Sequence, residues 1–284
     1  MPSPPSAHER LAHPHSRPYL RDGRARPGAV RVRLESPYEQ LGTHVTVVFP
    51  EQRVRRVVIT LPVEKGDGSK YGCGLDEIAR LPAHLRNGTV FAAPTFTESP
   101  WVVNHALRAD CQQEDHLVRV VVPTVLATLG AGAPPPVHLL GFSKGGFAAL
   151  NLLSRHPDLF GVASVWDASL LADRPPHPQL VEVAGSAARL EEYDVRHNIR
   201  RHADALRGAR RIALGGVGTL GADWTAGRRL LQRLDVPHDA YRDALAEHRW
   251  DGAWIGPAIE RILALEATLL PADVREERSG RVKD

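Results

Sequence analysis

The chain has 284 residues, a length that suits one domain with a sizeable hydrophobic core. Its formal net charge of +3 comes from residues 1–27, which contain five arginines and only two acidic residues, Glu9 and Asp22. In the rest of the chain the basic and acidic residues are equal in number, so we expect no basic surface for nucleic acid. There is no membrane-spanning apolar run and no secretory signal at the start, and two cysteines, Cys73 and Cys111, are too few for a disulfide framework. We therefore expect a cytoplasmic protein that binds neither nucleic acid nor membrane.

Both ends of the chain differ in composition from its middle. Residues 1–28 are rich in Pro, His, Arg and Ala without periodicity and predict a disordered leader. The charged residues 271–284 predict a flexible tail. The part between them, residues 29–270, is expected to form a single domain.

Within this domain, apolar or β-branched runs alternate with segments of helical periodicity. Strands are expected at residues 29–34, 43–49, 54–61, 90–93, 137–140, 158–167, 211–216 and 238–242. Helices are expected at residues 72–85, 115–129, 222–234 and 250–269, and directly after Ser143. The alternation predicts an α/β fold with a mainly parallel central sheet and helices on both faces, in which the first three strands are antiparallel. The polar, proline-bearing residues 168–209 are expected to form a lid-like excursion over the active face.

The sequence Gly-Phe-Ser-Lys-Gly at residues 141–145 joins an apolar strand to a helical pattern with Phe147, Leu150 and Leu153 on one face. In this context Gly-x-Ser-x-Gly forms a sharp turn that exposes the serine, and the glycines avoid collisions with the neighbouring strand and helix. Ser143 would then stand beside a helix N-terminus, whose N–H groups favour a developing negative charge. The alternative is an ordinary glycine-rich turn with an exposed serine.

A serine nucleophile needs a base and an acid that orients the base. His248 is the best candidate for the base, because it follows the last expected strand and precedes the last helix; otherwise it is a solvated loop histidine. Asp223, after the strand at residues 211–216, is the preferred acid, although it could instead cap the following helix. Asp167, at the end of the preceding strand, is the alternative acid.

The oxyanion of an acyl transfer reaction needs two backbone donors. One is expected to be the N–H of Lys144, which directly follows the nucleophile. The second is expected to be the N–H of Val63, because Pro62 has none. Trp101, Phe142 and Trp250 are candidates for the wall of a substrate pocket, although tryptophans also serve as core residues.

Three segments resemble the putative-esterase branch of the α/β-hydrolase superfamily, which includes feruloyl esterases, S-formylglutathione hydrolases and mycolyltransferases. They are Gly-Phe-Ser-Lys-Gly-Gly-Phe-Ala-Ala at 141–149, Arg-His-Pro-Asp-Leu-Phe-Gly at 155–161 and His-Arg-Trp-Asp-Gly-Ala-Trp at 248–254. The resemblance implies an α/β-hydrolase fold and a triad of Ser143, His248 and an acid, with no metal ion and no organic cofactor.

The leading hypothesis from the sequence is a serine hydrolase that cleaves a small-molecule carboxylic ester or thioester through an acyl-enzyme on Ser143. The same acyl-enzyme would also serve an acyltransferase or a cyclase if an alcohol or amine replaced water. A third hypothesis, from a different class, is a binding protein that keeps the hydrolase fold without turnover.

Overall fold

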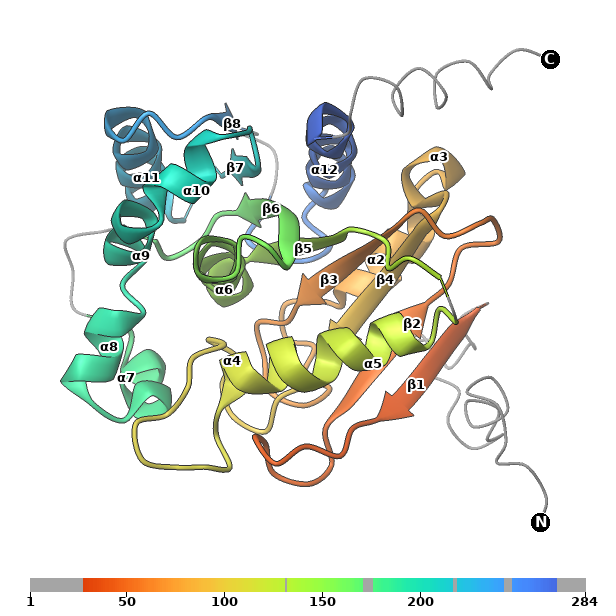
Figure 1. Ribbon diagram of the computed structural model, residues 1–284, viewed down its shortest axis with the longest axis horizontal. Helices are drawn as coiled ribbons and strands as arrows, with labels where there is room; N and C mark the ends of the chain where they lie inside the picture. Colours follow the sequence, from red (N-terminus) through yellow and green to blue (C-terminus); the bar gives the residue numbers. More distant parts are fainter. Residues whose placement is uncertain (1–27, 131, 171–175, 217–218, 243–246, 270–284) are drawn as a thin grey trace.

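The computed structural model describes residues 28–130, 132–170, 176–216, 219–242 and 247–269 (Figure 1). The predicted tail lies outside the described residues, and so does the predicted leader except for Gly28.

The core of the fold is an eight-stranded sheet in the order β1-β2-β4-β3-β5-β6-β7-β8. Its strands are β1 (Ala29–Arg33), β2 (His44–Val48), β3 (Arg56–Leu61), β4 (Thr89–Pro94), β5 (Val137–Phe142), β6 (Phe160–Trp166), β7 (Ile212–Gly215) and β8 (His238–Tyr241). β1 pairs with β2 and β2 with β4 in antiparallel fashion, and all other pairs are parallel. The predicted antiparallel start is therefore right for β1 and β2 and wrong for β3. Every residue of β3 is buried, as is typical of a central parallel strand covered on both faces.

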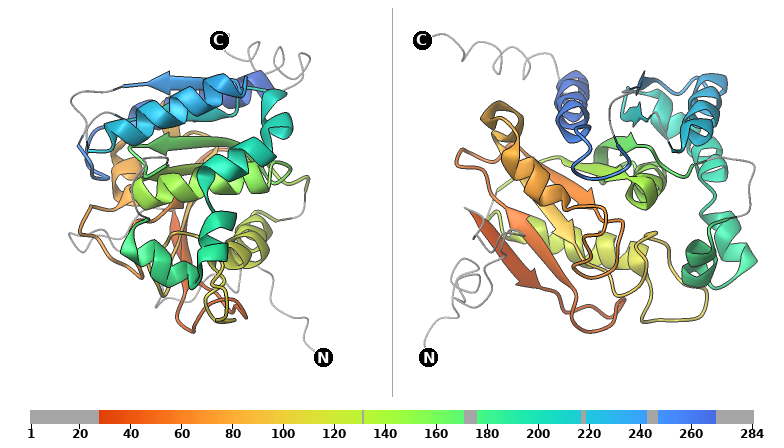
Figure 2. Two further views of the ribbon diagram at one scale, coloured as in Figure 1. Left: turned by 90° about the vertical axis from the view of Figure 1, so that its left-hand side faces the viewer. Right: turned by 180° about the vertical axis from the view of Figure 1, so that it is seen from behind.

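Helices cover both faces of this sheet, as Figure 2 shows. One face carries α2 (Gly74–Arg80), α3 (Ala83–Arg86) and α12 (Ile255–Leu269). The other face carries α4 (Gln113–His116), the π-helical turn η1 (Leu117–Val121), α5 (Val122–Ala127), α6 (Ser143–Arg155) and α11 (Gly221–Arg233). Two separate clusters of buried apolar side chains fill the two faces, which confirms the predicted fold class. None of the helices in the described part of the chain is long and apolar enough to span a bilayer.

Residues 176–209 contain four short helices on the side of α6 (Figure 1). They are α7 (Pro178–Ala184), α8 (Ala187–Glu192), α9 (Val195–Arg201) and α10 (Ala203–Arg207). Asn198 of α9 donates to Asn151 of α6 at 2.8 Å, and both side chains are buried. This group of helices is therefore fastened to α6, and its role as a lid stays a prediction.

A buried carboxylate joins the same helices to α4. Glu114 accepts two hydrogen bonds from the guanidinium of Arg155, at 2.7 and 3.0 Å, and a third from the hydroxyl of Tyr193. Burial alone would raise the pKa of Glu114, but hydrogen bonds from His156, Arg155 and Tyr193 lower it to about 2. The carboxylate is therefore ionised, and it holds α4, α6 and the segment after α8 together.

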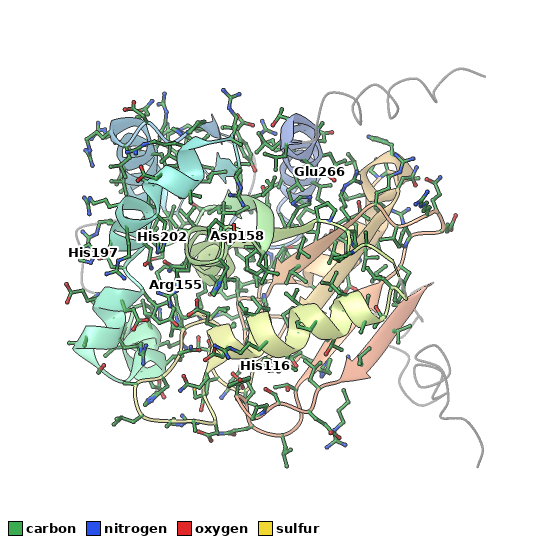
Figure 3. The ribbon with its side chains drawn as sticks, viewed as in Figure 1. His116, Arg155, Asp158, His197, His202 and Glu266 are labelled. Carbon is green, nitrogen blue, oxygen red and sulfur yellow. The ribbon has the colours of Figure 1, made fainter. Side chains whose placement is uncertain are left out.

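A second buried ion pair fastens α12 to the sheet. The guanidinium of Arg56, at the start of β3, donates to the carboxylate of Glu266 on α12 and also to Thr89 at 3.1 Å. Arg56 is 8% exposed and Glu266 is 3% exposed. The helix that follows the His248 loop is thus anchored to the sheet near its C-terminal end, where Figure 3 labels Glu266.

Candidate active site

Ser143 occupies a strained turn between β5 and α6. Its φ is +54°, a left-handed conformation that is uncommon for any residue other than glycine. The turn is tight enough to exclude side chains on both sides: a Cβ on Gly141 would lie 2.3 Å from the carbonyl of Gly145, and a Cβ on Gly145 would lie 2.5 Å from the carbonyl oxygen of Leu61. The motif thus has the geometry predicted from its sequence, with Ser143 partly exposed at the first residue of α6.

The loop between β8 and α12 brings His248 to the same end of the sheet. Its Nδ1 lies 2.7 Å from Oδ2 of Asp167, which follows β6 directly. The imidazole ring packs edge-on against the rings of Phe142 and Tyr71, with centroids 5.2 and 6.2 Å away. The loop is fixed in turn by the bond from the Trp250 N–H to the Tyr71 carbonyl at 2.7 Å. The histidine is therefore held by one carboxylate and two aromatic rings.

Asp167 is placed to orient an imidazole. It is 2% exposed, and its φ is +36°, which turns the chain sharply after β6. Its Oδ1 accepts the backbone N–H of Leu220 at 3.0 Å, while Oδ2 faces His248. A carboxylate oxygen can only accept a hydrogen bond, so Nδ1 of His248, which lies against Asp167, carries the ring proton. The other ring nitrogen, Nε2, is then able to accept a proton.

Asp223, the acid preferred from the sequence, lies in the first turn of α11 and is 1% exposed. It borders a cavity of about 310 Å³, together with Phe147, Leu180 and Tyr193. Neither Ser143 nor His248 is among the residues that line this cavity. The sequence preference for Asp223 over Asp167 is therefore not supported by this geometry. The loop before Asp223 still contributes to the site, but through the backbone N–H of Leu220.

Ser143 and His248 border one cavity of about 840 Å³, which we call the Ser143 cavity. Val63, Lys144 and Trp101 also border it, whereas Phe142 and Trp250 are buried and pack against each other, with ring centroids 4.9 Å apart. Of the three aromatic pocket candidates, only Trp101 thus reaches this cavity. Among the described residues, no group of three or more His, Cys, Asp or Glu side chains is arranged to hold a metal ion.

The two residues expected to supply oxyanion donors lie on adjacent segments. Lys144 is the second residue of α6, and Val63 follows β3, which is paired with β5. The carbonyl oxygen of Val63 lies 3.3 Å from Nζ of Lys144. Ser99 and Gln179 also contact this ammonium, and neither contact can be predicted from the sequence because both residues belong to segments without a motif.

Several solved structures share this architecture. The chain is similar to FphF, a fluorophosphonate-binding serine hydrolase of Staphylococcus aureus, with a TM-score of 0.63 and 14% identity over 84% of this chain and 97% of that one. It is also similar to an S-formylglutathione hydrolase from Agrobacterium tumefaciens (TM-score 0.64, 14% identity, 84% and 96% coverage) and to a ferulic acid esterase (0.63, 15%, 84% and 96%). Neither a family model nor a curated protein matches the sequence.

These likenesses identify the architecture as the α/β-hydrolase fold, and the three structures named here are of a serine hydrolase, an S-formylglutathione hydrolase and an esterase. The resemblance predicted from the sequence segments is thereby confirmed at the level of the fold. Because sequence identity is low, the activity of this chain has to be argued from its own site.

Proposed function

We propose that the protein is a serine hydrolase that cleaves a carboxylic ester or thioester of a small molecule through an acyl-enzyme on Ser143. The observation that carries the proposal is the pairing of His248 with Asp167 at 2.7 Å in a cavity that the strained Ser143 also borders. A strained serine alone would fit an inactive fold, but a serine that shares a cavity with an oriented imidazole is suited to nucleophilic catalysis.

In the first step, Nε2 of His248 accepts the proton of the Ser143 hydroxyl as the oxygen attacks the acyl carbonyl. Asp167 keeps the other ring proton on Nδ1 and stabilises the imidazolium that forms. The imidazolium then donates its proton to the departing alcohol or thiol. Asp167, and not Asp223, is therefore the acid in this mechanism.

The tetrahedral intermediate carries a negative oxygen, which the backbone N–H groups of Lys144 and Val63 are proposed to stabilise. The N-terminus of α6 adds the favourable end of its dipole. In the second step, water activated by His248 attacks the acyl-enzyme and releases the acid. This chemistry needs no metal ion and no organic cofactor.

Labelling with a fluorophosphonate tests the proposal. The reagent should phosphonylate the wild-type protein at Ser143, as mass spectrometry of the labelled peptide would show. Ser143→Ala should abolish labelling, and His248→Ala should slow it by about 10³-fold or more. Absence of labelling of the folded wild type would favour a non-catalytic binding protein and would refute the proposal.

The fate of the acyl group distinguishes hydrolysis from transfer. We expect the wild-type protein, not treated with the fluorophosphonate, to release free acid from a panel of short acyl esters and thioesters. Addition of an acceptor alcohol or amine should leave free acid as the main product, since water is the proposed acceptor. If the acyl group appears mainly on the added acceptor, the protein is an acyltransferase that uses the same acyl-enzyme.

A further inference from the structure

The side chain of Lys144 connects three separate segments around the Ser143 cavity. Its Nζ lies 2.6 Å from Oε1 of Gln179 on α7, 3.0 Å from Oγ of Ser99 in the loop after β4, and 3.3 Å from the carbonyl oxygen of Val63 after β3. An ammonium group has three N–H donors and no acceptor. All three donors therefore have a protein acceptor, and the group is not available to bind a substrate.

One of these acceptors belongs to the residue that is proposed to stabilise the oxyanion. The Val63 side chain is 4% exposed and packs in the apolar cluster on the α12 face of the sheet. Lys144 holds the carbonyl of the same residue, so Val63 is fixed both at its side chain and at its backbone. Pro62, just before it, restricts the backbone further. The Val63 N–H belongs to the preceding peptide plane, so the carbonyl contact acts on its orientation through the backbone torsions of Val63, which the buried side chain and Pro62 also restrict.

Lys144 is less exposed than Lys65 and Lys70, the other two lysines that the structure describes. It is one of only four lysines among 36 basic residues, and its ammonium lies 5.8 Å from the centroid of the Trp101 ring. Burial lowers the pKa of Lys144, the charge of Glu64 opposes this effect, and the charge of Lys70 adds to it. An ammonium in a partly desolvated position is costly unless its hydrogen bonds are made. The three acceptors supply those bonds.

A lysine suits three diverging acceptors better than an arginine does. The donors of an ammonium point away from one another, whereas those of a guanidinium lie in one plane. The acceptors of Lys144 come from three different segments and include one backbone carbonyl. The Lys144 ammonium thus matches the positions of its three acceptors, which would not be expected of a side chain that only extends into solvent.

We propose that Lys144 is a positioning residue: its ammonium holds the Val63 segment, the Ser99 loop and α7 in one arrangement, and thereby keeps the Val63 N–H directed at the oxyanion. This inference rests on the proposed hydrolase function. It gives the residue after the nucleophile two separate tasks, one for its backbone N–H and one for its side chain. It also connects α7 directly to the oxyanion site.

The test removes the ammonium and keeps the backbone. In Lys144→Met, kcat for a short acyl ester should fall about 10- to 100-fold, because a small displacement of an oxyanion donor weakens binding of the transition state. KM should change less than about threefold, since Lys144 makes no contact with the ground-state substrate in this proposal. The rate constant of fluorophosphonate labelling should fall in parallel with kcat. Arg80→Met, which removes an exposed basic group on α2, is the control for the change in charge and should leave kcat within about twofold.

Chemical rescue separates positioning from a general loss of structure. Lys144→Cys should have the same low kcat, and treatment with 2-bromoethylamine should restore most of it, because the thioether product ends in an amine at nearly the position of the lysine Nζ. Wild type treated in the same way controls for alkylation of Cys73, which is partly exposed, whereas Cys111 is buried.

The outcomes distinguish the two proposals. If wild type is neither labelled nor active, the hydrolase proposal fails. If wild type is active but Lys144→Met keeps kcat within about threefold, or if alkylated Lys144→Cys does not recover although it is folded, the positioning role is refuted. If Lys144→Met does not fold, the comparison of Lys144→Cys before and after alkylation decides, with recovery of kcat supporting the role and no recovery overturning it.

Discussion

The exchange of Asp167 for asparagine tests the triad most directly, because it changes one functional group without changing the shape of the side chain. The Oδ1 atom of asparagine can still accept the N–H of Leu220, which lies 3.0 Å from Asp167. This contact would turn the Nδ2 amide towards Nδ1 of His248, which the carboxylate now approaches to 2.7 Å. An amide donates where the carboxylate accepted, so Nδ1 would have to become the acceptor and the ring proton would move to Nε2.

A protonated Nε2 on a neutral imidazole cannot take the proton of Ser143. We therefore expect Asp167→Asn to lower kcat on the order of 10⁴-fold, with little change in KM. At 1.36 kcal/mol for each factor of ten, this corresponds to about 5 kcal/mol of lost transition-state stabilisation. The folded state should persist, since asparagine has nearly the same volume and keeps the Leu220 contact.

The assay is steady-state hydrolysis of the best ester from the panel, combined with thermal unfolding to show that each variant is folded. Asp223→Asn is the matched control, because it makes the same change in another buried aspartate at this end of the sheet. It should keep kcat within about fivefold. A larger loss of kcat in Asp223→Asn than in Asp167→Asn would refute the assignment of the acid.

Three further predictions concern the fold that supports the site. Gly141→Ala would place a Cβ 2.3 Å from the carbonyl of Gly145, so it should destabilise the protein by about 1–3 kcal/mol or more in chemical denaturation; an unchanged midpoint would contradict the tight turn. Arg56→Met removes the guanidinium that pairs with the buried Glu266, so it should lower the free energy of unfolding by about 3–5 kcal/mol. The double variant Arg56→Met/Glu266→Leu should recover most of this loss. If the effects of the two substitutions simply add, the pairing is contradicted. Burial lowers the pKa of His116 from its usual value to about 4, so the unfolded chain binds more protons than the folded protein between pH 6.5 and 4. The free energy of unfolding should therefore fall by up to about 3 kcal/mol as the pH drops through this range. His116→Gln should remove this pH dependence, as urea unfolding at several pH values would show.

The sheet and the elbow could be predicted from the sequence because both follow from local patterns. An apolar run, the spacing of two glycines around Ser143 and the helical period after it each restrict the backbone on their own. The direction of β3 relative to its neighbours cannot be predicted in this way, since the sequence of one strand carries no signal for the direction of the strands beside it. Its complete burial appears only when β4 and β5 are placed on either side.

The four helices in residues 176–209 could not be predicted for a different reason. Each has five to seven residues, which is too short to be stable by itself in water. They depend on contacts with distant residues, such as the hydrogen bond from Asn198 to Asn151. The contact of Gln179 with Lys144 is also one between residues far apart in the chain, and no local sequence pattern predicts it.

The choice between the two acids depends on the register of the sheet. Phe142 of β5 is paired with Trp166 of β6, so Ser143 and Asp167 are the next residues of two adjacent strands, and such strands lie about 4.8 Å apart. Trp166 is in turn paired with Gly215 of β7, which places the chain after β7 one strand farther from the nucleophile. Asp223 is a further eight residues along, inside α11, whereas Asp167 needs no connecting loop at all. An imidazole that bridges a serine and a carboxylate on neighbouring strand ends spans a short distance, so the register favours an acid after β6. The sequence shows that both aspartates follow strands, but only the pairing of the strands makes this difference visible.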